Sequence, residues 1–141
     1  MKLCMIGTGY VGLVSGTCFA DIGNNVICVD VDKNKIQNLK TGVIPIYEPG
    51  LQEMVKRNIY QKRLTFSNDV SHSIRKSDVI FICVGTPTNK KTNAAILKYV
   101  FQVANKIKSN LNKYKVIVTK STVPVTTGDK IESILKKNKF R

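Results

Sequence analysis

Three glycines with a fixed spacing are the residues of this sequence that most clearly could serve chemistry. Gly7, Gly9 and Gly12 form a Gly-x-Gly-x-x-Gly pattern directly after the apolar run Leu3–Ile6. In such a pattern the first glycine permits a tight turn, the second lets a diphosphate reach bare backbone, and the third lets a helix pack closely on the strand. Backbone N–H groups just behind the second glycine would face that diphosphate at the positive end of the helix. The pattern therefore predicts a dinucleotide cradle formed by Gly7, Gly9, Tyr10, Val11 and Gly12.

A carboxylate lies at the expected distance behind this cradle. The second apolar run, Val26–Val29, is followed directly by Asp30. At the end of a second strand a carboxylate can accept both hydroxyls of an adenosine ribose, and its charge would repel a 2′-phosphate. We therefore predict NAD rather than NADP as the cofactor, with Asp30 at the ribose. The alternative is an ordinary polar residue at the end of a strand.

The strongly basic composition also needs an explanation. The net charge is +14, and only four of the 23 basic residues are arginines. The lysines are scattered along expected helix faces and loops, whereas nucleic-acid recognition typically shows arginine clusters with interleaved aromatic residues. We interpret the lysines as solvated surface and predict no nucleic-acid partner.

The four cysteines and the single histidine do not have the spacing of a metal or redox site. Cys4, Cys18, Cys28 and Cys83 lie in apolar runs or on the first expected helix, and no two of them have metal-ligand or Cys-x-x-Cys spacing. We predict that all four are buried, reduced and inert. His72 has no partner in the sequence around it and is expected on a helix surface. No metal site is predicted.

The first twenty residues superficially resemble a signal peptide, with Lys2, then apolar residues, then small ones. However, only one lysine precedes the apolar part, and three glycines interrupt it. No apolar run is long enough to span a membrane. We therefore expect a cytoplasmic protein without a membrane partner.

Strand-like and helix-like stretches alternate along the 141 residues, which is typical of a parallel sheet with right-handed crossovers. We predict one α/β domain over residues 1–141, a Rossmann-type doubly wound parallel sheet with strand order 3-2-1-4-5. In that order the ligand lies between strands one and four, over the glycine turn on one side and Gly85–Thr88 on the other. Asp32 is the expected N-cap of the second helix. Strands are expected at 2–7, 25–30, 64–66, 79–84 and 116–119, and helices at 11–23, 33–41, 50–60, 69–76, 94–110 and 126–138.

A sixth strand beside the fifth is usual in doubly wound dinucleotide domains, but only one helix follows the expected fifth strand here. We therefore expect the sixth strand to be missing. This would leave Val116–Val118 as a bare apolar edge, which is a liability for a free-standing domain. On this ground we interpret the sequence as the front part of a longer protein.

Four sequence blocks resemble, in this order, the UDP-glucose/GDP-mannose dehydrogenase family of nucleotide-sugar dehydrogenases. They are Gly-Thr-Gly-Tyr-Val-Gly-Leu-Val from residue 7, Pro-Ile-Tyr-Glu-Pro-Gly-Leu from residue 45, Val-Gly-Thr-Pro from residue 84 and Lys-Ser-Thr-Val-Pro-Val from residue 120. The resemblance covers the whole chain and is to the NAD-binding domain, so the family's substrate and C-terminal domains are expected to be absent. The block at 45–51 favours UDP-glucose as the substrate over GDP-mannose or a UDP-N-acetyl sugar, and its Tyr47–Gly50 part resembles a loop that borders the active site.

The resemblance implies roles for the residues that match the family's motifs. Val11 corresponds to a diphosphate contact through its backbone, Asp30 to the ribose acceptor and Lys35 to a second contact on the adenosine side. Thr86 would line the cofactor near the middle of the cleft. Thr122 would reach the nicotinamide end or hold a water near the reacting carbon, so it is also the candidate catalytic residue. The alternatives are an exposed helix lysine at position 35 and turn threonines, each close to a proline, at the other two positions.

The sequence departs from the family at two positions. Glycine is often found where Thr126 stands, and an acidic residue where Ala95 is expected to open the helix at 94–110. The loss of that acid would remove a favourable charge from a helix N-terminus.

The family oxidises the C6 alcohol of the sugar to a carboxylate in two hydride transfers, with two NAD⁺ and a cysteine thioester. This chemistry needs a nucleophilic cysteine and a lysine and asparagine that stabilise oxyanion charge, and the family's motifs for them do not occur in this sequence. Cys83 is no substitute, because no cation stands beside it in the sequence. The resemblance therefore implies part of an enzyme that converts UDP-glucose to UDP-glucuronate and forms a homo-oligomer at full length, while this chain alone is expected to be inactive. A non-catalytic NAD-binding module remains the other interpretation.

Overall fold

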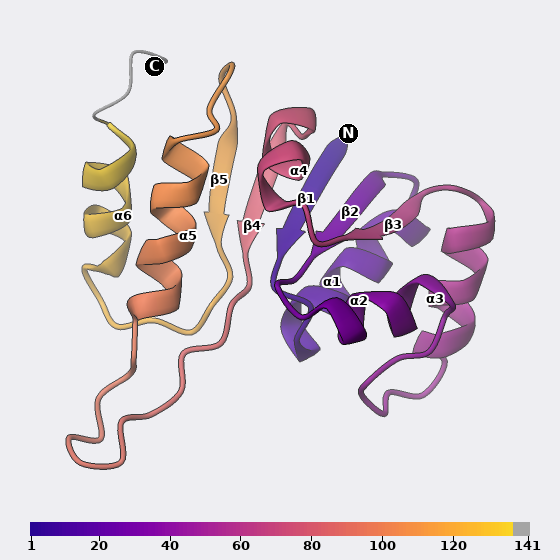
Figure 1. Ribbon diagram of the computed structural model, residues 1–141, viewed down its shortest axis with the longest axis horizontal. Coiled ribbons are helices and arrows are strands. Elements are labelled where there is room, and N and C mark those ends of the chain that lie inside the picture. Colours follow the sequence, from indigo (N-terminus) through magenta and orange to yellow (C-terminus); the bar gives the residue numbers. More distant parts are fainter. Residues whose placement is uncertain (137–141) are drawn as a thin grey trace.

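The computed structural model describes residues 1–136, which form a parallel five-stranded sheet with helices on both faces (Figure 1). The strand order is β3-β2-β1-β4-β5, as predicted. The strands are β1 (Lys2–Ile6), β2 (Asn25–Val29), β3 (Leu64–Ser67), β4 (Val79–Ile82) and β5 (Val116–Thr119). The helices are α1 (Tyr10–Asp21), α2 (Lys33–Lys40), α3 (Leu51–Tyr60), α4 (Val70–Lys76), α5 (Lys98–Lys108) and α6 (Thr127–Leu135).

The side chains of the central strand β1 belong to two separate cores. Leu3 and Met5 lie in a buried cluster with residues of α1, α2 and α3, whereas Cys4 and Ile6 lie in a second cluster with residues of α4, α5 and α6. Successive side chains of a strand point to opposite faces of its sheet. The helices α1–α3 therefore cover one face and α4–α6 the other, which is the doubly wound arrangement that the sequence predicts.

Two short helices begin at aspartate N-caps, which determine where these helices start. The side chain of Asp32 accepts a hydrogen bond from the Lys35 amide at 3.0 Å, which confirms the predicted cap of α2. Asp69 accepts from the His72 amide at 2.9 Å at the start of α4. Such caps satisfy amides that have no acceptor inside the helix. The side chain of His72 is exposed on α4, as expected.

Two element boundaries on the β4 side of the cleft differ from the prediction. β4 ends at Ile82 rather than at residue 84, and α5 begins at Lys98 rather than at residue 94. Residues 83–97 form a loop in which Thr88 and Ala95 make an antiparallel bridge. Because the backbone of Ala95 is used in this bridge, Ala95 does not open the helix. The expected effect of a missing acidic residue at that N-terminus therefore does not apply.

The cysteines follow the prediction at three positions out of four. Cys4, Cys28 and Cys83 are buried, whereas Cys18 is exposed on α1. The buried stripe of α1 runs through Leu13, Gly16, Thr17 and Ala20, and position 18 lies outside that stripe. The prediction was wrong for Cys18 because an apolar sequence context does not place every residue of a helix against the core.

The last helix confirms the predicted start to within one residue. α6 begins at Thr127, and its final residue is Leu135. The prediction extended this helix to residue 138, but Lys136 already caps its C-terminal end, and residues 137–138 lie outside the described residues. In the described part of the chain, no helix has the length and apolar character needed to cross a bilayer.

β5 is the outer strand at one end of the sheet, beside α5 and α6 (Figure 1). The Val116 amide donates to Asp78 O and the Lys120 amide to Ile82 O, both toward β4. Alternate residues of a parallel strand face opposite neighbours, so the intervening amides face outward. Within residues 1–136 no strand pairs with that outer edge, and Val116 is 43% exposed.

Candidate functional site

The glycine turn brings β1, α1 and the end of β4 into contact. Gly7 has a φ of +103°, and its amide donates to Val29 O at 2.8 Å. A Cβ atom on Gly12 would lie 1.9 Å from Gly7 O, so α1 can approach the turn this closely only with glycine at that position. A Cβ on Gly7 would lie 2.8 Å from Cys83 O. Protein packing alone therefore requires the first and third glycines of the motif.

Protein packing does not explain the second glycine. Gly9 is the N-cap residue of α1, and a Cβ placed on it would meet no atom within 4 Å. Behind it, the amides of Tyr10 and Val11 belong to the first turn of α1, where a helix supplies no acceptor. That turn contains no acidic side chain. Gly9 thus exposes a bare helix N-terminus, an arrangement that can hold a diphosphate.

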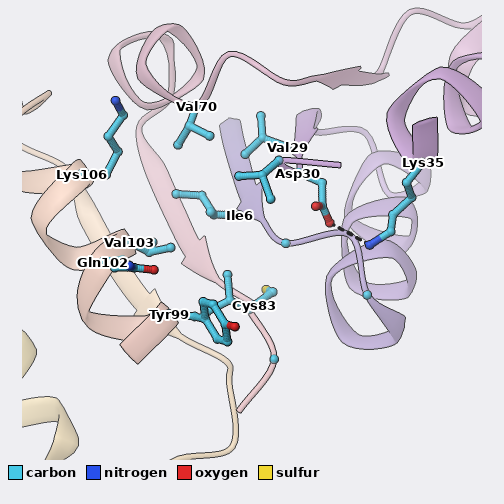
Figure 2. Close-up of a pocket in the computed structure, with 15 residues that line it drawn as sticks. Ile6, Val29, Asp30, Lys35, Val70, Cys83, Tyr99, Gln102, Val103 and Lys106 are labelled. Carbon is cyan, nitrogen blue, oxygen red and sulfur yellow. Dashed lines mark hydrogen bonds and ion pairs between the residues drawn. The ribbon is translucent and has the colours of Figure 1, made fainter. Parts of the chain in front are cut away.

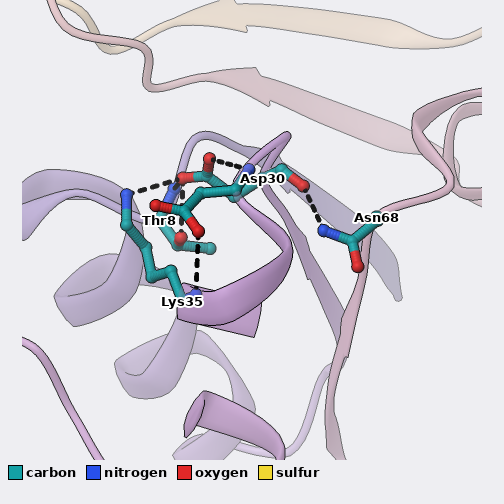
Figure 3. Close-up of polar contacts among 5 residues, drawn as sticks. Thr8, Asp30, Lys35 and Asn68 are labelled. Atoms are coloured by element: carbon teal, nitrogen blue, oxygen red, sulfur yellow. Dashed lines mark hydrogen bonds and ion pairs between the residues drawn. The ribbon is translucent and has the colours of Figure 1, made fainter. Parts of the chain in front are cut away.

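Asp30 follows β2 and accepts hydrogen bonds on both of its carboxylate oxygens (Figure 3). Oδ2 accepts from the Thr8 amide at 3.0 Å, from Thr8 Oγ1 at 2.7 Å and from Lys35 Nζ at 3.1 Å. Oδ1 accepts from the Asp32 amide at 3.1 Å. Burial of Asp30 raises its pKa, but these hydrogen bonds outweigh burial, and the net pKa lies below the ordinary 3.8. Asp30 is therefore an ionised acceptor, held in place by its neighbours.

One cleft of about 560 Å³ connects the glycine turn with Asp30 and reaches across to α5 (Figure 2). Its lining is mostly apolar between these ends. One part of the lining was predicted from the sequence, and it consists of Gly7, Gly9, Asp30, Lys35 and Gly85. The residues on the α4 and α5 side were not predicted, and they are Val70, Tyr99, Gln102, Val103 and Lys106.

A signal for the missed residues is present in α5. The buried stripe of this helix is Val100, Ala104 and Ile107. The cleft residues Tyr99, Gln102, Val103 and Lys106 form a second stripe directly beside it, with the i, i+3, i+4, i+7 spacing of one helix face. In the structure this second stripe borders the cleft, so its helical spacing beside the core stripe was the available signal.

Thr86 and Thr122 lie together at the carboxyl ends of β4 and β5. Thr86 Oγ1 donates to the Thr122 carbonyl at 2.8 Å, and Ser121 Oγ donates to Val84 O at 2.7 Å. These bonds join the loop after β4 to the loop after β5. Thr122 is exposed and Thr86 is half-buried, and neither lines the cleft that Asp30 borders. Sequence reasoning missed the role of Ser121 in holding the two loops together.

The loop before α3 lies against the start of α1. The Tyr10 hydroxyl donates to Glu48 Oε2, and this hydrogen bond raises the pKa of Tyr10. Tyr47 beside it is 90% exposed. Two of the four family-like blocks, at 7–14 and 45–51, are therefore in direct contact.

Cys83 lines the cleft but is not activated. Burial raises its pKa to about 11, although Lys120 acts in the opposite direction. A nucleophilic cysteine has a lowered pKa instead. Cys83 is therefore a packing residue, as expected from the sequence.

Comparison with known proteins agrees with this geometry. The model of the UDP-glucose/GDP-mannose dehydrogenase family, NAD binding domain, matches residues 1–141. The chain belongs to this family. Its cofactor is NAD, as the sequence predicts.

Several relatives of this dehydrogenase family are similar over nearly the whole chain. UDP-glucose 6-dehydrogenase TuaD of Bacillus subtilis is 60% identical over 136 residues, and UDP-glucose 6-dehydrogenase of Rhizobium meliloti is 53% identical. Each match covers 96% of this chain but only 29% and 31% of the relative. The chain thus spans about 30% of the length of these relatives.

Solved structures from the same family have the same fold. GDP-mannose dehydrogenase from Pseudomonas aeruginosa superposes with a TM-score of 0.89 at 33% identity, over 98% of this chain and 33% of that one. The UDP-N-acetyl-mannosamine dehydrogenase Cap5O from Staphylococcus aureus gives a TM-score of 0.90 at 31% identity, over 100% of this chain and 34% of that one. The fold is therefore shared by relatives whose names differ in the sugar nucleotide.

Proposed function

We propose that this chain is the NAD-binding part of a UDP-glucose 6-dehydrogenase. The observation that carries the proposal is that one cleft joins an open helix N-terminus at Gly9 to an ionised carboxylate at Asp30. In NAD the diphosphate is linked directly to the adenosine ribose, so the diphosphate would lie at Gly9 and the ribose at Asp30. The 60% identity to a UDP-glucose 6-dehydrogenase supports the assignment of the whole protein.

The residues of the cleft fit the adenosine half of NAD. The amides of Tyr10 and Val11 would hold the diphosphate beside Gly9, and Asp30 would accept a ribose hydroxyl. Lys35 lies at the same end, in an ion pair with Asp30. The adenine would lie against the stripe on α5 that begins with Tyr99.

The nicotinamide half would extend toward the joined loops after β4 and β5. There we assign Thr86 to the lining of the cofactor and Thr122 to the region next to the reacting carbon. When bound, NAD⁺ accepts the hydride from the sugar alcohol. The described residues position that acceptor, but Cys83 supplies no thiolate for a thioester step because burial keeps it protonated. We therefore expect residues 1–141 alone to bind NAD without oxidising a nucleotide sugar.

UDP-glucose is the substrate that the observations favour for the whole protein. The relatives with 60% and 53% identity are UDP-glucose 6-dehydrogenases, whereas the solved GDP-mannose and UDP-N-acetyl-mannosamine dehydrogenases are 33% and 31% identical. The second candidate is the same domain with a GDP-mannose or UDP-N-acetyl-sugar specificity. The shared fold of those structures supports that alternative, and a non-catalytic NAD module is the third.

Calorimetric titration tests the cofactor site. The chain should bind NAD⁺ more tightly than NADP⁺, and Asp30→Ala should weaken NAD⁺ binding by about tenfold or more, since it removes a charge-assisted acceptor. Asp129→Ala is the matched control, because Asp129 is exposed in the first turn of α6 and does not line the cleft. Unchanged NAD⁺ affinity in Asp30→Ala would show that the ribose assignment is wrong.

A chimera tests the enzymatic assignment. Residues 1–136 of this chain replace the matching part of B. subtilis TuaD, to which they are similar over their length. The chimera should form NADH with UDP-glucose, as TuaD itself is expected to do. NADH formation should be lost when Asp30→Ala is introduced into the chimera. A folded chimera that binds NAD⁺ but forms no NADH would favour the non-catalytic module.

A further inference from the structure

Thr8 lies at a position that the glycine motif leaves free, between Gly7 and Gly9, and yet it is completely buried. Both of its hydrogen-bond donors end on one atom. The amide and the hydroxyl of Thr8 donate to Asp30 Oδ2, at 3.0 and 2.7 Å (Figure 3). A buried hydroxyl can be satisfied by any nearby carbonyl, so its choice of the candidate ribose acceptor is informative.

The hydrogen bonds leave the two oxygens of Asp30 with different capacities. Oδ2 accepts three hydrogen bonds, two from Thr8 and one from Lys35, whereas Oδ1 accepts one, from Asp32. An ionised carboxylate offers about two acceptor positions on each oxygen. Oδ2 is therefore saturated, and Oδ1 is the oxygen that has room for a further donor.

The donors on Oδ2 also differ in how easily they can leave. Lys35 Nζ is on a long side chain that is 29% exposed, and it can swing away into solvent. The Thr8 amide is part of the glycine turn, and the Thr8 hydroxyl is enclosed by protein. Thr8 thus provides the fixed part of the grip on Asp30.

We infer that Thr8 is a positioning residue that holds Asp30 through Oδ2 and thereby reserves Oδ1 for one hydroxyl of the cofactor's adenosine ribose. The inference rests on the proposed function, which puts that ribose at Asp30. It also refines the expectation from sequence that Asp30 accepts both ribose hydroxyls, because one oxygen is already occupied. Without the Thr8 hydroxyl, Oδ2 keeps the Thr8 amide as its one fixed donor beside the mobile Lys35, so the orientation of Oδ1 is held less firmly.

Electrostatics favour the same arrangement. The hydrogen bonds from Thr8 help to hold the pKa of Asp30 below its usual value, against the effect of burial. A carboxylate that stays ionised remains a pure acceptor, which is the form that a ribose hydroxyl requires.

The experiment compares two cofactors on one set of variants. Binding of NAD⁺ and of the analogue that lacks the 2′-hydroxyl on the adenosine ribose is measured by calorimetry for the wild type, Thr8→Val and Thr8→Ser. Valine keeps the branched shape without the hydroxyl, and serine keeps the hydroxyl. We expect wild type to prefer NAD⁺ over the analogue, Thr8→Val to reduce that preference by about five- to tenfold, and Thr8→Ser to restore most of it.

Thr17→Val is the matched control. Thr17 is also fully buried, and its hydroxyl donates to Leu13 O at 2.7 Å inside α1 rather than to the site. This variant should lose stability as Thr8→Val does, while its preference between the two cofactors stays at the wild-type value. In carbon-detected NMR the carboxyl of Asp30 should titrate at a higher pH in Thr8→Val, and at the wild-type pH in Thr17→Val.

The outcomes separate this inference from the proposed function. If the wild type binds NAD⁺ and Thr8→Val keeps the full preference for it, Thr8 is only a structural residue and the inference is wrong. If the wild type binds neither cofactor, the proposed function fails and this inference fails with it. If Thr8→Val does not fold, Thr8→Ala takes its place, because it removes the same hydroxyl and leaves a smaller side chain. It is judged by the same ratio of the NAD⁺ affinity to the analogue affinity.

Discussion

Asp30 accepts four hydrogen bonds from residues between positions 8 and 35, whereas the Thr122 carbonyl is held by one, from Thr86, which is 36 residues away in the chain. The β1–β2 side of the cleft is thus built from a short stretch of sequence and packs tightly around its glycines. The β4–β5 side consists of two loops with exposed side chains at the edge of the sheet. The difference indicates that the end of the cleft at Asp30, where we propose that the adenosine binds, is preformed, whereas fewer hydrogen bonds hold the loops at the opposite end.

The largest expected effect tests the tight packing of the β1–β2 side of the cleft. Gly12→Ala places a Cβ 1.9 Å from Gly7 O, so backbone has to move. We expect a loss of about 4 kcal/mol in the free energy of unfolding, measured by urea denaturation.

Gly128→Ala provides the comparison on the second side. Gly128 lies in α6, where a Cβ would meet nothing within 4 Å. This change should be neutral or stabilise by up to about 1 kcal/mol, since alanine is the better helix former. Equal effects at the two glycines would contradict the contrast between a packed and an open side.

An intermediate effect is expected from the pH dependence of the free energy of unfolding, and it concerns the β1–β2 side alone. The pKa of Asp30 is below its ordinary 3.8 in the folded chain, so the unfolded chain binds the proton more readily. Asp30 therefore stabilises the fold above pH 3.8, and this contribution disappears as the pH falls through the lowered value. Asp30→Asn should cost about 1–2 kcal/mol at neutral pH, and the difference from wild type should shrink in acid.

Thermal and urea unfolding of both proteins across this pH range checks the prediction. The loops at 83–97 and 120–126 contain no acidic residue, so they cannot give the same pH dependence. A constant difference between the two proteins down to the lowest pH would show that the Asp30 hydrogen bonds contribute nothing to stability.

The smallest effect concerns strain on the second side. Thr126 precedes α6 with a φ of +73°, a left-handed conformation that is unfavourable for a β-branched residue. Thr126→Gly should raise the free energy of unfolding by about 1 kcal/mol. Thr122→Gly, in the same loop but without a positive φ, is the control and should give no gain. If both changes destabilise, the strain at Thr126 is not significant.

The same contrast explains what the sequence could predict. The turn at Gly7, the helix behind it and Asp30 all lie within about one supersecondary unit, and local patterns define them. The start of α5 was misplaced because Thr88 and Ala95 pair across a loop, and the helical spacing of the next apolar residues conceals that pairing. Tyr99 was not predicted as a cleft residue, because the apolar spacing of a helix identifies the face toward the core and not the face toward a cleft.

Thr8 shows a second limit of sequence reasoning. The glycine motif treats its position as variable, and nothing in the sequence shows that its hydroxyl reaches Asp30, 22 residues later. Likewise, the family's preference for glycine at position 126 gained its physical reason only from the backbone angle. Contacts between distant segments are determined by the packing of the sheet, which motif spacing does not describe.

The hydrogen bond from Thr86 to the Thr122 carbonyl has a mechanical consequence. Two loops from neighbouring strands are tied together within four residues of the ends of those strands, so displacement of one loop pulls on the other. A molecule that touches only the loop after β5 would therefore be sensed at the loop after β4. In a titration followed by NMR, the amide signals of both threonines should shift in step.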